Sequence, residues 1–447
     1  MNRLLLTTSL TLATVLLGHA ENWANWRGPL YNSSSPEKGL PEKFSKTENI
    51  KWAAPLPGYS AATPAIHGDR VFVSSADART SKQLALCFDR KTGRELWRAE
   101  VGENATTDRQ NSNTCSPSPA TDGKIVVFFY GNGDLRGFDV GGKKLWERNI
   151  GPFAFQWTFS TSPLLLDGRL YMQVLQRDVA VNGRGKPTGN ESFLLAIDPQ
   201  TGRDLWKHLR PSDAAAESLE AFSTPTPFTH NGRKELIIVG GDCITGHNPA
   251  DGRELWRWGT WNPTKIGHWR LVPSPTVGAG VVLACAPKNA PVYAVKVGGS
   301  GTLDNKSLAW QSHVQKEEDE ATAAPSPKDR DITSDVPTPL FYEGRFYLLN
   351  GTKKKLMCLD PATGRVVWSG DLGKSTFQSS PTAADGKIYV MNWDGDVFVV
   401  QAGGSEFKLL HTTNLKDEGD KFLRPSVAIS QGNLYIRTGQ KLYCVGK

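Results

Sequence analysis

The stretch Ala196-Ile197-Asp198-Pro199-Gln200-Thr201-Gly202-Arg203-Asp204-Leu205-Trp206 decides the fold. An apolar run ends in an Asp-x-x-Thr-Gly turn, and the segment after the turn ends in Trp. An Asp side chain accepts hydrogen bonds from the backbone just beyond it, and Gly adopts positive φ without strain, so the pattern predicts two strands joined by a tight turn. The half-unit recurs at residues 89–97 and 360–368, and weaker copies end at Trp146, Trp256 and Trp310.

A second half-unit precedes each of these copies, with Ser or Thr before Pro, then a Gly and a short apolar strand. Eight copies start at Thr63-Pro64, Ser118-Pro119, Ser162-Pro163, Thr226-Pro227, Ser274-Pro275, Thr338-Pro339, Ser380-Pro381 and the degenerate Ser426-Val427. Each whole unit supplies four short strands, and one such sheet cannot bury both of its faces. Radial packing of the sheets solves this problem and leaves only short edges. We therefore expect an all-β, eight-bladed β-propeller of four-stranded antiparallel blades.

The two ends of the chain complement each other in this pattern. The last unit stops before any strand that ends in Trp, whereas Ile50-Lys51-Trp52-Ala53-Ala54 has no unit of its own. We expect this N-terminal strand to complete the C-terminal blade and so close the ring.

The repeat resembles that of the pyrroloquinoline-quinone (PQQ) repeat superfamily, whose motif Ala-x-Asp-x-x-Thr-Gly-x-x-x-Trp is matched by residues 196–206. The resemblance covers residues 47–447, and Asn25-Trp26-Arg27-Gly28-Pro29 resembles the leading segment of secreted PQQ-repeat proteins. It implies one of two kinds of protein, a PQQ-dependent dehydrogenase or a non-catalytic BamB-like propeller of outer-membrane assembly. The latter carries a lipidated Cys after its signal, where this chain has Glu21.

The N-terminus has the pattern of a secretory signal. Arg3 precedes the apolar residues 4–18, and small residues end at Ala20. We expect a signal peptide over residues 1–20 with cleavage after Ala20, an N-terminal segment over 21–46, and a single propeller over 47–447. The protein is then predicted to be periplasmic or secreted and monomeric, with no membrane span and no lipid anchor.

Composition argues against nucleic acid as a partner. The formal net charge is +7, but 52 basic residues are scattered among 45 acidic ones, and it is clustering that marks a nucleic-acid footprint. Cys87, Cys358 and Cys444 occupy equivalent places in different repeats. Even in neighbouring blades, equivalent positions lie on facing sheets about 10 Å apart, which is too far for a disulfide. We expect these three to be buried free thiols. No pairing is predicted among Cys115, Cys243 and Cys285.

Hallmarks of catalysis are missing from the sequence. Eight-bladed quinoprotein dehydrogenases, which the resemblance implies as one option, typically hold PQQ with an adjacent Cys-Cys pair and coordinate calcium through acidic and amide side chains. The sequence has no Cys-Cys, Cys-x-x-Cys-His, Gly-x-Ser-x-Gly or Walker motif, and its eight His are dispersed. Asp89, Asp198 and Asp360 are explained by their turns. We predict no catalytic residue, metal or cofactor, and PQQ with calcium is the alternative.

Loops that precede the innermost strands supply the candidate binding site, because such loops meet at one end of a propeller axis. Residues 151–157, 261–270 and 422–424 are rich in aromatic and polar side chains. The candidate ligand-binding residues are Gln156, Trp157, His268, Trp269, Arg270 and Arg424, with Trp for stacking and Arg for anion contact. Alternatively, these loops simply plug the channel.

Three functions remain open from the sequence. The favoured hypothesis is a non-catalytic secreted or periplasmic scaffold that presents a funnel of loops to a protein or other extracellular ligand. The alternatives are a divergent PQQ-dependent oxidoreductase and a protein that binds a saccharide or another extracellular polymer.

Overall fold

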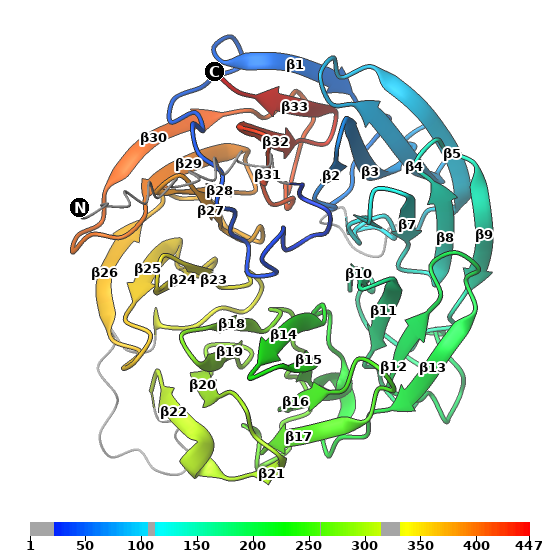
Figure 1. Cartoon of the computed structure of the whole chain (residues 1–447), viewed down its shortest axis with the longest axis vertical. Helices are drawn as coiled ribbons and strands as arrows, with labels where there is room; N and C mark the ends of the chain where they lie inside the picture. Colours follow the sequence, from blue (N-terminus) through cyan, green and yellow to red (C-terminus); the bar gives the residue numbers. More distant parts are fainter. Residues whose placement is uncertain (1–21, 106–111, 260, 314–330) are drawn as a thin grey trace, which may run out of the picture.

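The computed structural model describes residues 22–105, 112–259, 261–313 and 331–447, and eight sheets surround one axis in it (Figure 1). The predicted signal peptide lies outside the described residues. The eight-bladed all-β prediction is confirmed, and the only helices among the described residues are two short 3₁₀ turns, η1 (Ala216–Leu219) and η2 (Asn305–Ser307). None of the described helices has the length and apolar character needed to cross a membrane.

Each blade runs from an innermost strand near the axis to an outermost strand. Blade one contains β2 (Ala65–His67), β3 (Arg70–Ala76), β4 (Lys82–Asp89) and β5 (Glu95–Glu103). Blade two contains β6 (Ala120–Thr121), β7 (Ile125–Phe129), β8 (Asp134–Asp139) and β9 (Lys144–Asn149). Blade three contains β10 (Leu164–Leu166), β11 (Arg169–Val174), β12 (Phe193–Ile197) and β13 (Asp204–Leu209). Blade four contains β14 (Thr226–His230), β15 (Arg233–Gly240), β16 (Cys243–His247) and β17 (Glu254–Trp258).

The second half of the ring repeats this order. Blade five contains β18 (Thr276–Gly278), β19 (Val281–Cys285), β20 (Val292–Lys296) and β22 (Leu308–Gln311). Blade six contains β23 (Leu340–Tyr342), β24 (Arg345–Asn350), β25 (Lys355–Leu359) and β26 (Val366–Asp371). Blade seven contains β27 (Thr382–Ala384), β28 (Lys387–Met391), β29 (Asp396–Gln401) and β30 (Leu409–Asn414). Blade eight contains β31 (Ala428–Ser430), β32 (Asn433–Arg437), β33 (Lys441–Val445) and, on its outer edge, β1 (Ile50–Pro55).

The N-terminal strand lies in the last blade. β1 pairs antiparallel with β33, and Trp52 faces Cys444. In six other blades the Trp of the outermost strand likewise faces a small residue, Cys, Gly or Ala, as Trp206 faces Ala196. Trp52 thus occupies in blade eight the place that Trp holds elsewhere, while His411 holds it in blade seven.

The Trp side chains bind neighbouring blades together. In six blades the indole N–H donates to a backbone carbonyl of the next blade at 2.7–3.1 Å, as Trp146 Nε1 donates to Pro199 O. The Gly of the Thr-Gly turn lies against the ring: Gly202 has φ +73°, and a Cβ there would lie 2.7 Å from Trp146. The turn therefore needs Gly both for its backbone conformation and for the approach of the ring.

The turn Asp residues act as expected. Asp89 Oδ1 accepts from the backbone N–H of Lys91 and Thr92 and from the Thr92 hydroxyl, at 2.8–3.0 Å. Asp360 makes the equivalent contacts, and Asp198 accepts from the Gln200 N–H at 2.8 Å.

A ring of eight hydroxyl groups surrounds the axis. The backbone N–H of each member donates to the side-chain oxygen of the next blade's member at 2.8–3.2 Å. The members of this hydroxyl ring are Thr63, Ser118, Ser162, Thr224, Ser274, Thr338, Ser380 and Ser426.

The ring corrects one detail of the predicted repeat. Blade four carries two Thr-Pro dipeptides in tandem, and the unit starts at Thr224, not at Thr226 as predicted. Thr226 lies one layer further along β14, where its hydroxyl donates to Pro275 O at 2.9 Å, just as Thr276 donates to Pro339 O. The inter-blade hydrogen bonds, not the dipeptide alone, select the register.

Blade four also has a fifth strand. β21 (Gly301–Leu303), from the segment between β20 and β22, pairs in parallel with the outer edge of β17. This strand covers an edge that other blades leave to solvent, and it departs from the four-stranded pattern at this one blade.

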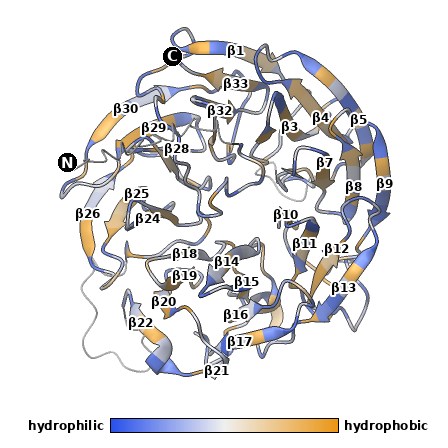
Figure 2. Ribbon diagram, in the orientation of Figure 1, coloured by the Kyte–Doolittle hydropathy of each residue, from blue (hydrophilic) through white to orange (hydrophobic). Residues whose placement is uncertain are grey.

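The core lies between the blades. The middle strands are buried almost throughout, whereas β5 and β13 alternate between more and less exposed positions, a banding that the outermost strands display in Figure 2. All six Cys are buried and unpaired, so the prediction for Cys87, Cys358 and Cys444 is confirmed. Burial raises the pKa of the Cys87 thiol to about 12, which keeps it protonated.

The N-terminal segment crosses one end of the axis before it reaches β1 (Figure 1). Trp23 pairs with Ile66 of blade one, and the backbone N–H of Thr121 in blade two donates to Ala24 O. Further on, Ser33 O accepts from Ala383 N in blade seven. The contacted residues lie within the innermost strands rather than in the loops before them, so the segment closes the axis opposite those loops.

Candidate functional site: a cavity on the propeller axis

All eight blades contribute to a cavity of about 280 Å³ on the axis, called here the axial cavity. Extended chains point alternate side chains the same way, so the residue two positions before each hydroxyl-ring member also faces the axis. All eight of these residues line the cavity: Ala61, Ser116, Ser160, Phe222, Val272, Val336, Gln378 and Arg424. Six members of the hydroxyl ring form the layer below: Ser118, Ser162, Thr224, Thr338, Ser380 and Ser426.

This eight-residue layer has two sides of different character. Blades four, five and six contribute Phe222, Val272 and Val336, which we call the apolar arc. The adjoining blades seven, eight, one, two and three contribute the polar arc, apart from the small Ala61 of blade one: Gln378, Arg424, Ser116 and Ser160. The cavity is therefore amphipathic across its width.

Further residues complete the cavity. Trp26, from the N-terminal segment, lines it at the closed end, while Trp157 and Arg270 reach it from the loops before blades three and five. Trp157 is 41% exposed, and its Nε1 donates to Glu217 Oε1 at 3.0 Å. Arg270 Nη2 lies 3.3 Å from Asp335 Oδ2, and its Nη1 has no hydrogen-bond partner among the described residues.

The six predicted site residues divide into two groups. Trp157, Arg270 and Arg424 line the axial cavity together. The Gln156 side chain instead accepts from Arg177 Nη2 at 2.6 Å, outside the cavity lining. Their roles in binding stay predictions.

The other two predicted residues lie elsewhere in the loop before blade five. His268 is exposed and does not line the cavity. Trp269 is 8% exposed and packs in a core cluster with Trp261 and Leu271, outside the cavity lining.

Gln378 and Phe222 were not among the predicted site residues. Neither lies in a segment rich in aromatic and charged residues, which was the selection criterion. Their position in the repeat is the signal that identifies them. Each stands two residues before the hydroxyl-ring member of its blade, Gln378 before Ser380 and Phe222 before Thr224.

Two carboxylates hold the loop that carries Trp157. Glu220 Oε1 accepts from Arg177 Nε at 2.6 Å, and both of its carboxylate oxygens lie 3.0 Å from Gln156 N. Burial raises the pKa of Glu220 to about 7, against the lowering effect of these donors. Glu217 from η1 holds the Trp157 indole, so the position of this ring is fixed by a neighbouring segment.

At the closed end, Arg27 is a buried cation. It is 3% exposed, and its Nη2 donates to Pro339 O at 2.7 Å and to Thr276 Oγ1 at 3.3 Å. Its Nε and Nη1 have no hydrogen-bond partner among the described residues. Burial lowers the pKa of Arg27 to about 9.

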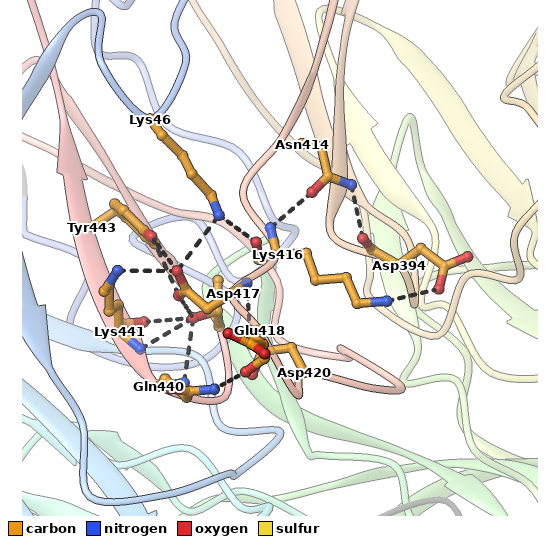
Figure 3. Close-up of polar contacts among 11 residues, drawn as sticks. Lys46, Asp394, Asn414, Lys416, Asp417, Glu418, Asp420, Gln440, Lys441 and Tyr443 are labelled. Atoms are coloured by element: carbon orange, nitrogen blue, oxygen red, sulfur yellow. Dashed lines mark hydrogen bonds and ion pairs between the residues drawn. The ribbon is translucent and has the colours of Figure 1, made fainter.

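A polar cluster anchors the loop that leads to Arg424 (Figure 3). Asp417 accepts from Lys441 Nζ at 3.0 Å and from the Tyr443 hydroxyl at 3.1 Å, and Lys46 Nζ of the N-terminal segment lies 3.5 Å away. Although burial opposes them, these hydrogen bonds lower the pKa of Asp417. The guanidinium of Arg424 is in turn oriented by its Nε, which donates to Gln378 Oε1 at 2.5 Å.

The lining does not fit PQQ with calcium. Calcium takes oxygen ligands, commonly carboxylates, yet none of the described residues that line the cavity is acidic. The amide oxygen of Gln378 already accepts from Arg424. Among the described residues, no three His, Cys, Asp or Glu side chains are grouped as a metal site.

Comparison with curated proteins finds distant relatives. Tetrathionate hydrolase of Acidithiobacillus ferrooxidans is 21% identical over 391 residues, which cover 84% of this chain and 59% of that protein. Polyvinylalcohol dehydrogenase of a Sphingopyxis species is 24% identical over 407 residues, which cover 83% of this chain and 54% of that protein. The chain thus spans little more than half the length of these relatives.

Solved structures share the fold. BamB from Moraxella catarrhalis has a TM-score of 0.60 at 13% identity, over 89% of this chain and 99% of that one. A europium-containing methanol dehydrogenase has a TM-score of 0.69 at 11% identity, over 96% and 98%. Quinohemoprotein alcohol dehydrogenase from Comamonas testosteroni has a TM-score of 0.66 at 13% identity, over 95% of this chain and 81% of that one. At these identities the likeness concerns architecture alone.

A family model extends over most of the propeller. The model, described as outer membrane protein assembly factor BamB, matches residues 44–158, 153–315 and 301–406. Together with the eight blades, this match shows that the chain belongs to the PQQ-like, BamB-like β-propeller family.

Proposed function

We propose that this protein is a non-catalytic binding propeller of the periplasm or the extracellular space, and that it holds its ligand in the axial cavity. The observation that carries the proposal is the cavity itself, lined by two Trp rings, two guanidinium groups and a ring of hydroxyls on rigid blades. Ligand sites commonly combine apolar surface with a few placed polar groups. This proposal retains the hypothesis of a non-catalytic scaffold from the sequence, and we propose that the protein acts as a monomer.

The environment of Trp157 supports a site rather than a plug. A side chain that plugged the channel would be buried, whereas Trp157 keeps 41% of its surface exposed while it lines the cavity. The hydrogen bond to Glu217 fixes its ring, so little conformational entropy remains to be lost on binding.

The test is a ligand screen on the full secreted chain, with thermal stability as the readout. The panel contains extracellular saccharides, small organic acids, tetrathionate, and PQQ with and without calcium. A hit should raise the melting temperature, since a ligand that binds only the folded state stabilises it. The Trp157→Ala variant should lose this shift, and the exposed outer-strand variant Leu205→Ala should keep it.

Two results would overturn the proposal. One is that no ligand of the panel raises the melting temperature, or that Trp157→Ala keeps the shift of every hit. The other is calcium-dependent PQQ binding with dye-linked oxidation of an alcohol or sugar, which would establish an oxidoreductase.

Binding of an extracellular polymer is the second candidate function. The exposed Trp157 ring favours it, because a solvent-accessible aromatic face can stack on one unit of a chain that continues outside the cavity. Polymer binding predicts that affinity rises with the length of the oligomer, whereas a small ligand enclosed by the cavity shows no such dependence. Titration with oligomers of increasing length separates the two.

A further inference from the structure

We propose that the axial cavity selects a small amphipathic organic anion, with its carboxylate, sulfonate or sulfate group toward the polar arc and its apolar part against Phe222, Val272 and Val336. This inference rests on the proposed function and names the ligand class of the same site. The two arcs lie on opposite sides of one cavity of about 280 Å³, which suits a ligand with two chemically different ends.

The hydroxyl ring below both arcs and the polar arc itself offer donors. Each hydroxyl-ring oxygen already accepts a backbone N–H from the neighbouring blade, which leaves its own O–H proton to donate. Gln378 accepts from Arg424 through Oε1, so its amide NH₂ is the group left for a ligand. Outside the polar arc, Arg270 of the loop before blade five adds a buried Nη1 without a hydrogen-bond partner among the described residues.

Charge points in the same direction. Arg270 and Arg424 line the cavity, and no acidic residue is among the described residues that line it. Asp335 pairs with Arg270 and Glu217 with Trp157, both from outside the lining. A buried group that has no compensating charge or hydrogen bond costs free energy, so an anion gains here and a cation loses.

The closed end of the cavity strengthens this preference. Arg27 lies near the axis at that end, buried next to Trp26, which lines the cavity. Among the described residues, its hydrogen-bond acceptors are a carbonyl and a hydroxyl rather than a carboxylate. Its uncompensated charge adds a positive potential in a region of low dielectric constant.

Neutral ligands fit this wall less well. A saccharide hydroxyl can pair with the serine and threonine hydroxyls, but it forms only a neutral-acceptor hydrogen bond with the guanidinium groups and the Gln378 NH₂. A carboxylate or sulfonate makes charge-assisted hydrogen bonds with the same guanidinium groups, and these are stronger. Selectivity for the anion therefore comes from these charge-assisted contacts.

Three matched probes test the ligand class by calorimetric titration of the full secreted chain at low ionic strength. They are phenylacetate, 2-phenylethanol and phenethylamine, which share an aromatic body and differ in charge. We expect phenylacetate to bind at least about tenfold more tightly than the alcohol, because charge-assisted hydrogen bonds are stronger than neutral ones, and we expect no measurable binding of the amine.

Equal or tighter binding of the alcohol or the amine overturns the inference. If no probe binds while a neutral saccharide from the ligand screen does, the anion inference fails and the proposed function stands. If neither the probes nor the screen give any binding, both fail.

Variants locate the site. Gln378→Glu keeps the side-chain shape and the acceptor for Arg424, but it replaces the NH₂ donor by a negative oxygen. We expect at least about tenfold weaker phenylacetate binding with an unchanged melting temperature. Arg98→Gln, on the outer strand β5 where Arg98 pairs with Glu95, changes the net charge equally and should leave the affinity unchanged. The inference is wrong if Gln378→Glu binds as the natural chain does, or if both variants lose affinity equally.

The apolar arc has its own test. Val336→Thr changes a methyl group to a hydroxyl at a half-buried position with nearly the same shape. Phenylacetate binding should weaken roughly fivefold, while binding of inorganic sulfate, which has no apolar part, should not change. Equal weakening for both anions would contradict the two-sided orientation.

Discussion

Trp157 and Trp269 occupy the same position in two blades, five residues before the ring members Ser162 and Ser274, yet their surroundings differ. Trp157 is 41% exposed and lines the axial cavity, whereas Trp269 is 8% exposed and belongs to a core cluster. Residue type and repeat register are shared, so neither decides the role of the ring. The decisive factor is the segment that packs beside each loop.

One short segment contacts both loops. In η1, Glu217 accepts from the Trp157 indole, while the Ser218 hydroxyl oxygen accepts from the Trp269 backbone N–H at 2.9 Å. The Ser218 hydroxyl also donates to Ile266 O at 2.5 Å, which draws the loop before blade five against η1. Glu217 thus holds the exposed Trp157 through its indole N–H, whereas Ser218 holds the buried Trp269 through its backbone N–H.

The largest expected effect comes from truncating the two rings. Trp269→Ala removes a buried aromatic side chain and should lower the free energy of unfolding by about 3–5 kcal/mol. Trp157→Ala removes an exposed ring and one hydrogen bond and should cost about 1 kcal/mol. Urea denaturation of both variants measures the difference. Similar losses for both variants would refute the assignment of Trp157 to a site and Trp269 to the core.

A pH-dependent difference between the two loops is the next effect in size. Asp242 contacts the buried loop, because its Oδ2 accepts from Asn262 Nδ2 at 2.7 Å, and burial raises its pKa to about 7. A carboxyl that takes up protons more readily when folded destabilises the fold as pH rises from about 4 to about 7. Asp242→Asn should therefore raise the free energy of unfolding by about 2–4 kcal/mol at pH 8 and by less at pH 5.

The control for this prediction is Glu220, which carries a similarly raised pKa but pairs with Arg177. Glu220→Gln deprives Arg177 of its ionic partner, so its gain at pH 8 should be smaller than that of Asp242→Asn. Denaturation curves at both pH values test the pair. A gain for Asp242→Asn that does not depend on pH would show that the carboxyl is ionised in the folded protein throughout this range.

The sequence predicts the blades well because each repeat carries its own turn and strand chemistry. Its limits appear where distant segments decide. Thr224 and Thr226 both precede Pro, and only the hydrogen bonds to the neighbouring blades distinguish them. β21 pairs with β17 of the preceding blade, and no local pattern encodes that contact.

The lining of the axial cavity was predicted in part, for a similar reason. Arg424 was found by residue type, while Gln378, which lies beside it, was missed because its segment is not rich in functional groups. Both share the position two residues before the ring member of their blade. The position within the repeat therefore identifies the residues that form the wall of the cavity. The exposure of Trp157 and the burial of Trp269 depend instead on η1, a segment that is not part of the repeat.

The smallest expected effect concerns the contact that separates the two rings. Glu217→Gln retains a carbonyl acceptor for the Trp157 indole, whereas Glu217→Ala removes it, so the alanine variant should lose about 1 kcal/mol of stability and the glutamine variant less. The ring freed by Glu217→Ala must lose conformational entropy when a ligand binds, and affinity should fall although no ligand contact is removed. Fluorescence anisotropy of the protein, with Trp157→Phe to identify the contribution of this indole, should report greater ring mobility in Glu217→Ala alone. Unchanged mobility together with unchanged affinity would mean that packing against the cavity wall, rather than η1, holds Trp157 in place.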